Sequence, residues 1–159
     1  MAILCVVRHA IAEPRDPERW PDDSLRPLTA AGEASFRTAA AGLRRIVPSV
    51  DVVLSSPYER AWRTAGILHD AGWPRPSRCD ELAALRAPSD VVPILRAHEN
   101  GSTIGLVGHE PHLSNLVSLL TGAVGIRLKK GGVACLELTG DETELRWLAT
   151  PKILRLLGS

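Results

Sequence analysis

The sequence predicts an α/β fold, a three-layer α/β/α arrangement whose central sheet is mostly parallel and has an antiparallel edge. Short apolar runs alternate with longer segments that carry apolar residues at helical spacing. This alternation is typical of a parallel sheet covered by helices on both faces. The last two apolar runs follow one another across the turn Thr139-Gly140-Asp141, which indicates an antiparallel hairpin. The 159 residues suit one domain, and we expect a single domain over residues 1–159.

The expected strands are short runs rich in aliphatic and β-branched residues. The first, Ala2 to Val7, is apolar throughout, as in a strand that is buried on both faces. Two similar runs occupy residues 51–54 and 103–107, and a shorter strand is expected at 78–82. The hairpin strands are expected at 131–138 and 144–149.

The expected helices are marked by capping and stop signals. Thr29 is a candidate N-cap for a helix that reaches Ile46, and a second helix runs from Pro57 to about Ala71. Two shorter helices are expected at 90–98 and 111–120. Residues 11–27 form a polar, proline-rich loop, and a loop of this length in a compact domain is usually functional.

The overall charge excludes some classes of partner. Nineteen basic and eighteen acidic residues leave a formal net charge of +1, so we expect neither a nucleic-acid partner nor a membrane partner. No apolar stretch approaches the roughly 20 residues of a membrane helix. The three cysteines, Cys5, Cys79 and Cys135, form no CxxC pair, which favours a reducing, cytoplasmic location.

The candidate site residues follow three of the predicted strands. Arg8 and His9 follow the first strand, Arg60 lies in the first helical turn after the second, and His109 follows the third. Each of these alone fits a solvated turn or a helix surface. Because ligands of open α/β sheets bind beyond the carboxyl ends of the strands, we expect the four side chains to meet.

Two guanidiniums and two imidazoles suit phosphoryl transfer. Guanidinium forks match phosphate oxygens, and a neutral imidazole can attack phosphorus if its other nitrogen is held by a hydrogen bond. A nucleophilic histidine divides the transfer into two displacements through phosphohistidine. We expect no metal and no cofactor, because His109 and His112 lack the HExxH spacing and no nucleotide-binding motif is present.

These segments resemble the motifs of the histidine phosphatase superfamily, which includes phosphoglycerate mutase. Arg8-His9-Ala10 resembles the family's Arg-His-Gly/Ala signature. The segment from Ser55 to Ala61, with Thr64-Ala65, resembles its second-arginine motif, and Gly108-His109-Glu110-Pro111 its second-histidine motif. The resemblance spans nearly the whole chain. It implies the phosphoglycerate mutase-like fold, phosphorylation of His9, and a phosphate pocket formed by Arg8, Arg60 and His109.

Within the superfamily, the short chain and the segment Arg26 to Gly32 resemble the small SixA-like phosphohistidine phosphatases. This places Arg26 at the edge of the substrate pocket. One position departs from the pattern, because Ala84 stands where many members carry a catalytic Glu. Glu81 is offset by three residues and would face the other way in an extended segment, and Glu13 is a more distant candidate.

The resemblance therefore predicts a phosphatase that acts on protein phosphohistidine or on a small phosphate ester. The missing acid favours phosphohistidine, because an imidazole leaving group needs less proton donation than an alkoxide. Two alternatives stay open: a non-catalytic phosphate-binding or interaction module, and a mutase-type phosphotransferase. Because His9 must be neutral to attack while a protonated His109 would bind phosphate best, we expect a bell-shaped pH dependence. The sequence leaves open the oligomeric state and whether loop 11–27 closes over the pocket.

Overall fold

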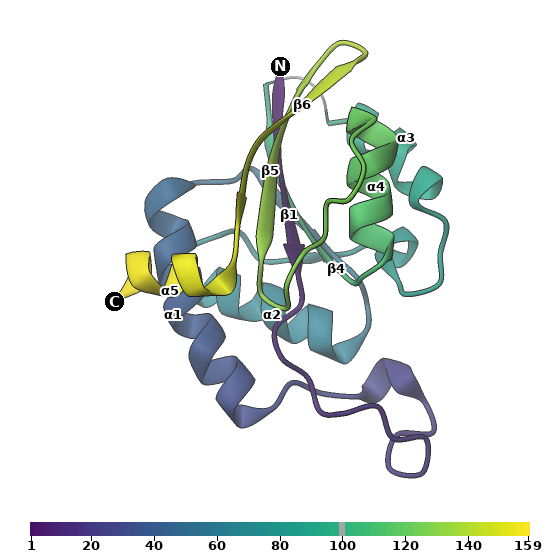
Figure 1. Ribbon diagram of the computed structural model, residues 1–159, viewed down its shortest axis with the longest axis vertical. Coiled ribbons are helices and arrows are strands. Elements are labelled where there is room, and N and C mark those ends of the chain that lie inside the picture. Colours follow the sequence, from purple (N-terminus) through teal and green to yellow (C-terminus); the bar gives the residue numbers. More distant parts are fainter. Residues whose placement is uncertain (99–100) are drawn as a thin grey trace.

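The part of the chain that the computed structural model describes, residues 1–98 and 101–159, contains one six-stranded sheet (Figure 1). The strand order is β3-β2-β4-β1-β5-β6. The first four strands in that order are parallel, and β5 and β6 form the antiparallel edge. The predicted mostly parallel α/β sheet is thus confirmed. The strands are β1 (Ala2–Arg8), β2 (Val52–Ser55), β3 (Ser77–Arg78), β4 (Thr103–Gly108), β5 (Val133–Thr139) and β6 (Glu142–Ala149).

Helices cover both faces of the sheet. One face packs against α1 (Ala30–Ile46), α2 (Glu59–Asp70) and α5 (Pro151–Gly158), and the other against α3 (Val92–Arg96) and α4 (His112–Thr121). Successive residues of β1 alternate between these two cores: Leu4 and Val6 face α4, whereas Cys5 and Val7 face α1 and α2. This alternation follows from the two-residue period of a strand, and it explains why the run is apolar throughout.

Three predicted elements are wrong in detail. The expected strand at 78–82 is limited to Ser77–Arg78, because a 3-10 turn at Asp80–Leu82 turns the chain inward and buries Leu82. The expected helix at 90–98 is a 3-10 turn at Pro88–Val91 followed by the short α3. The second helix begins at Glu59 rather than at Pro57, because Ser56 to Tyr58 form the connection that leaves β2.

The C-terminal helix α5 was not predicted. Thr150 caps it by accepting a hydrogen bond from the Ile153 amide, and Pro151 occupies its first turn. It packs closely on α1, where a Cβ atom at Gly42 would lie 1.9 Å from the carbonyl oxygen of Leu154. The Thr-Pro start was the available signal, but so short a segment carries little periodicity.

The topology brings three strand ends to one edge of the sheet. β4 lies between β1 and β2, and Arg8 at the end of β1 is in register with Gly108 at the end of β4. The loop over residues 11–27 returns along this edge, where the Glu13 amide donates to the Pro27 carbonyl (2.9 Å). Among the helices of the described residues, none has the length and apolar character needed to cross a membrane.

Candidate active site

The structure brings the four predicted residues, Arg8, His9, Arg60 and His109, into one cavity of about 590 Å³, here called the strand-end cavity. The imidazole rings of His9 and His109 lie 5.3 Å apart between centroids. His9, Arg60 and His109 are all more than nine-tenths buried. Arg26 lines the same cavity. Residues separated by 100 positions in the sequence therefore surround one space.

The imidazole of His9 is held in one orientation by the backbone. Its Nδ1 lies 2.6 Å from the carbonyl oxygen of Ala10, and because a carbonyl can only accept, Nδ1 carries the proton. Nε2 is then left with a lone pair. The backbone here is fixed in turn, since the Ala10 amide donates to Thr64 Oγ1 (3.0 Å), which donates to the Arg60 carbonyl (2.7 Å). The arrangement is that of an imidazole prepared to act as a nucleophile.

The electrostatic surroundings keep His9 neutral. Burial lowers its pKa to about 3, although the hydrogen bond to Ala10 acts in the opposite direction. The neighbouring guanidiniums of Arg60, Arg8 and Arg26 lower the pKa further. At neutral pH the Nε2 lone pair is therefore available.

His109 is positioned by Ser56, a residue that the sequence analysis did not single out. Its Nε2 lies 2.7 Å from Ser56 Oγ, which also accepts a hydrogen bond from the Tyr58 amide (3.2 Å). This hydroxyl can donate its O–H to Nε2, and in the tautomer that we assign on this basis the His109 proton lies on Nδ1. Burial, with His9 and Arg60, lowers the pKa of His109 to about 2. A neutral His109 thus already offers an N–H donor to an anion. The sequence analysis expected a protonated ring at this position, whereas the ring is neutral before an anion binds.

Both arginines are oriented by hydrogen bonds to the backbone. Arg8 Nη1 donates to the Leu128 carbonyl (2.8 Å), and Arg60 Nη1 donates to the Asp23 carbonyl (2.8 Å). Arg60 Nη2 also donates to Asp23 Oδ2 at 3.0 Å. Burial lowers the pKa of both guanidiniums, yet arginine stays charged in proteins.

Three N–H groups of the strand-end cavity have no hydrogen-bond partner within the described part of the chain. They are Arg8 Nε, Arg60 Nε and His109 Nδ1, and all three atoms are buried. Leaving a buried donor unpaired costs about 1–3 kcal/mol, so native structures rarely do so without a functional reason. Two cations and three unpaired donors around an imidazole lone pair fit a tetrahedral oxyanion such as phosphate.

Arg26 lines the cavity, and its side chain is hydrogen-bonded to other residues of the loop 11–27. Its Nε donates to Asp23 Oδ1 and its Nη1 to the Glu13 carbonyl, both at 2.8 Å. Asp23 therefore joins Arg26 to Arg60, and so docks the loop of residues 11–27 onto the cavity. Burial acts against the charge of Asp23, but Arg26 and Arg60 outweigh it and lower the pKa of the carboxyl. Apart from its place in a polar loop, nothing in the sequence marks Asp23 as a site residue.

Ala84 lines the cavity and carries no acid, and the carboxylates that line it within the described residues belong to Glu13, Asp23 and Glu110. Glu81 does not line it and accepts a hydrogen bond from Cys79. Glu110 lines the cavity, but its two carboxylate oxygens accept hydrogen bonds from the Ser114 and Leu128 amides. Glu13 also lines the cavity and lies 3.8 Å from an Arg19 nitrogen.

His112 is a second histidine of this region. It is buried, lines the strand-end cavity, and has no well-formed hydrogen bond at either ring nitrogen within the described residues. Burial lowers its pKa. Residues 1–98 and 101–159 contain no group of three or more His, Cys, Asp or Glu side chains arranged to hold a metal ion.

Comparisons with known proteins show which family the chain matches. A family model of the histidine phosphatase superfamily (branch 1) matches residues 4–86. An uncharacterized protein of Mycobacterium tuberculosis is 36% identical over 110 residues, which cover 67% of this chain and 68% of the relative. An uncharacterized protein of Picosynechococcus sp. is 31% identical over 95% of this chain and 98% of its own length.

Solved structures show the same fold. The protein histidine phosphatase SixA complexed with tungstate superimposes with a TM-score of 0.87 at 25% identity, covering 96% of this chain and 99% of that one. The alpha-ribazole phosphatase of Shigella flexneri superimposes with a TM-score of 0.73 at 19% identity, covering 94% and 96%. Fold and site thus define a protein of the phosphoglycerate mutase-like class. Within that class, the chain belongs to the histidine phosphatase superfamily, and its architecture is SixA-like.

Proposed function

We propose that this chain hydrolyses phosphohistidine on proteins, using His9 as the nucleophile and Arg8, Arg60 and His109 as the phosphate-binding groups. The observation that carries the proposal is the set of three buried, unpaired N–H donors beside a histidine whose Nε2 lone pair is free. The tungstate in the related SixA structure supports it, because tungstate is a tetrahedral oxyanion. Arg26 acts at the edge of the cavity, through its bond to Asp23.

In the first displacement, His9 Nε2 attacks phosphorus and forms a new P–N bond, while the bond between phosphorus and the leaving group breaks. The negative charge on the phosphoryl oxygens is stabilised by Arg8, Arg60 and the His109 Nδ1–H, whose positions are fixed before substrate binds. The proton stays on His9 Nδ1 throughout, hydrogen-bonded to the Ala10 carbonyl. In the second displacement, water attacks phosphorus and the P–N bond to His9 Nε2 breaks. Inorganic phosphate leaves with the protons of the water, and the neutral ring is restored.

The leaving group decides the substrate class. A departing alkoxide must be protonated, and a positioned acid contributes typically about 10²–10⁴-fold to such steps. Here Ala84 occupies the usual acid position, and Asp23 and Glu110 are engaged with N–H donors. A phosphohistidine leaving group that is protonated on its distal nitrogen departs as a neutral imidazole. The site is therefore better suited to cleave P–N bonds than P–O bonds of sugars.

Steady-state assays with a histidine-phosphorylated protein and with a sugar phosphate test this assignment. We expect kcat/KM to be at least about 100-fold higher for the phosphohistidine protein, the lower end of the contribution of a general acid. Faster turnover of the sugar phosphate would reject the proposed substrate class. An Ala84→Glu variant sharpens the test, because restoring a carboxyl group should raise activity on the sugar phosphate selectively.

A further inference from the structure

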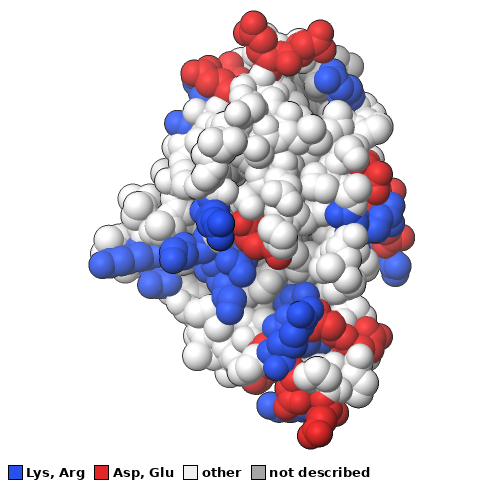
Figure 2. Space-filling view, turned by 45° about the vertical axis from the view of Figure 1, so that its right-hand side comes forward, with Lys and Arg blue, Asp and Glu red and all other residues white. Residues whose placement is uncertain are grey.

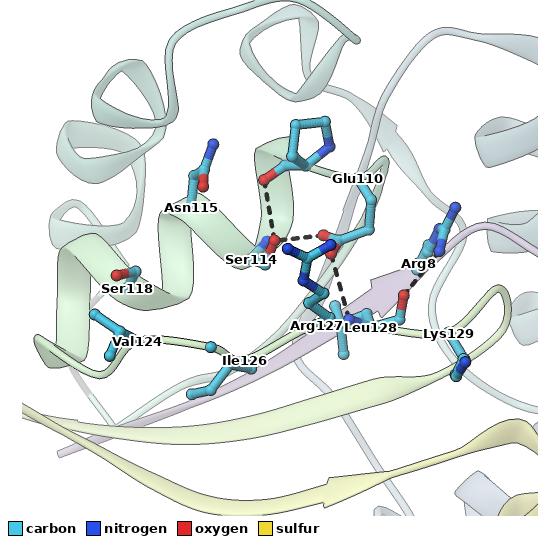
Figure 3. Close-up of a pocket in the computed structure, with 12 residues that line it drawn as sticks. Arg8, Glu110, Ser114, Asn115, Ser118, Val124, Ile126, Arg127, Leu128 and Lys129 are labelled. Atoms are coloured by element: carbon cyan, nitrogen blue, oxygen red, sulfur yellow. Dashed lines mark hydrogen bonds between the residues drawn. The ribbon is translucent and has the colours of Figure 1, made fainter.

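A second groove opens beside the strand-end cavity, between α4 and residues 124–129 (Figure 3). Its volume is about 650 Å³, within the range of ligand-binding sites. It shares Arg8, Glu110, Pro111 and Asn115 with the strand-end cavity, so the two spaces are adjacent. We call it the α4 groove and define it by Arg8, Ser114, Asn115, Ser118, Arg127 and Lys129.

The two walls of the α4 groove differ in chemistry. The α4 wall presents the hydroxyls of Ser114 and Ser118 and the amide of Asn115, at successive turns of one helix face. The opposite wall carries Arg127 and Lys129, whose side chains are exposed. Neither forms an ion pair with another described residue. The groove thus offers hydrogen-bonding groups on one side and uncompensated positive charge on the other.

Among the described residues that line the groove, Glu110 carries the one carboxylate, and the three basic side chains of Arg8, Arg127 and Lys129 outweigh it. Glu110 Oε1 accepts from the Ser114 amide (2.8 Å) at the start of α4, and its Oε2 accepts from the Leu128 amide (3.3 Å). The Leu128 carbonyl in turn accepts from Arg8 (2.8 Å). Glu110 therefore joins both walls to one of the phosphate-binding arginines, and it fixes the shape of the groove before a ligand enters.

We infer that the α4 groove binds an acidic segment of the substrate protein, adjacent to its phosphohistidine. Charge complementarity selects this occupant, because Arg127 and Lys129 line the groove together with Arg8. Figure 2 shows basic side chains in a broken band across the middle of this face, interrupted by acidic ones near its centre and at its right-hand side, with further acidic side chains at the top and bottom. A small phosphate ester held in the strand-end cavity would leave the groove unused, whereas a protein chain must pass its rim. The inference rests on the proposed function.

Two phosphohistidine peptides of equal length test it, one with Asp and Glu flanking the phosphorylated residue and one with Ser and Gln. Electrostatic steering changes association rates by about 10–10³-fold, so we expect kcat/KM to favour the acidic peptide by about tenfold at low salt. High salt should remove most of that preference, because exposed charges are screened. A wild-type enzyme that turns over both peptides equally at low salt would overturn the inference.

Variants of the groove residues test where the preference for the acidic peptide arises. In R127E/K129E, kcat/KM for the acidic peptide should fall about tenfold or more, while turnover of phosphoramidate, a small substrate with the same P–N bond, stays unchanged. R75E/K152E is the matched control: both residues are exposed, neither lines the groove or the strand-end cavity, and the charge change is identical. An equal loss in the control, or no loss in R127E/K129E, would overturn the inference.

The same assays separate this inference from the proposed function. If the wild type hydrolyses a sugar phosphate but neither peptide, the proposed function fails, and the inference fails with it. If the wild type hydrolyses both peptides but R127E/K129E retains the wild-type preference, the function stands and the groove assignment alone is wrong. If R127E/K129E instead loses turnover only of a small phosphate ester that carries a carboxylate, the occupant is a small molecule and the inference is overturned.

Discussion

The strand-end cavity and the α4 groove share Arg8, yet they are built in opposite ways. In the cavity, His9, Arg60 and His109 are buried and each is held by a defined hydrogen bond to backbone or to Ser56. In the groove, Arg127 and Lys129 are exposed and hold no ion pair with the described residues. Fixed, desolvated groups stabilise a developing charge, whereas mobile exposed charges mainly steer a partner.

This difference teaches where chemistry and selectivity reside in a small phosphatase. Removing a side chain of the cavity should lower the turnover of every substrate in the same proportion, because all substrates present the same phosphoryl group. Removing a side chain of the groove should lower the turnover only of substrates that extend beyond the phosphoryl group. The predictions below test whether the cavity behaves as such a common centre.

Among the groups that bind the phosphoryl oxygens, the largest effect is expected at Arg60. Arg60→Ala removes one of the two phosphate-binding cations, and loss of one such preorganised donor typically lowers kcat by about 10²–10³-fold. The loss should be equal for phosphoramidate and for a phosphohistidine peptide. Arg63→Ala is the control, since Arg63 lies on the same helix but pairs with Glu33 at the surface. A loss confined to the peptide would place Arg60 outside the common centre.

The two buried imidazoles should also shape the stability of the protein against pH. Folding lowers the pKa of His9 to about 3 and of His109 to about 2, whereas an unfolded histidine titrates near 6.5. Below pH 6.5 the unfolded chain binds protons that the folded chain does not, so stability is lost as the pH falls. Between pH 7 and 5 the loss should be roughly 2 kcal/mol for each histidine.

Urea unfolding at pH 7 and at pH 5, in buffer without phosphate, measures this dependence. His9→Gln should remove the His9 share of it and so flatten the curve. His112, whose pKa is also lowered, contributes with the same sign in both proteins and cancels in the comparison. An unchanged slope in His9→Gln would show that His9 is not kept neutral by burial.

A smaller effect is expected at Ser56. Ser56→Ala removes the partner of His109 Nε2, and a lost buried hydrogen bond of this kind costs about 1 kcal/mol, or several-fold in kcat. The ring can then turn its proton away from the phosphate, so kcat should fall while KM changes little. Ser55→Ala is the matched control, because Ser55 is equally buried but donates only to the Ser56 carbonyl. Equal losses in both variants would indicate a packing effect.

Much of the fold and the arrangement of the site could be predicted from the sequence. The buried strands were visible because parallel strands are apolar on both faces, and the helix at Ala30–Ile46 carries a capping Thr29 and a regular apolar face. The convergence of Arg8, His9, Arg60 and His109 followed from one rule, that the carboxyl ends of parallel strands meet at one edge. That rule needs only the strand boundaries, which the apolar runs define well.

The parts that could not be predicted depend on tertiary contacts. Ser56 orients His109, which lies 53 residues away in the sequence. Thr64 holds the backbone beside His9 through the Ala10 amide, 54 residues away. The sequence of a small hydroxyl residue does not indicate such a role. Asp23 reaches Arg60 only because the loop folds back along the sheet edge. The segment after Arg78 turns inward because Leu82 packs in the core, which overrides its extended pattern.

The central claim is that the phosphoryl group passes to Nε2 of His9. Rapid quenching of the enzyme with a ³²P-labelled phosphohistidine protein, followed by alkaline workup and peptide mapping, tests it directly. The account predicts acid-labile label on His9 in the wild type, and neither label nor turnover in His9→Ala. Label on any other residue, or hydrolysis by His9→Ala at the wild-type rate, would contradict it.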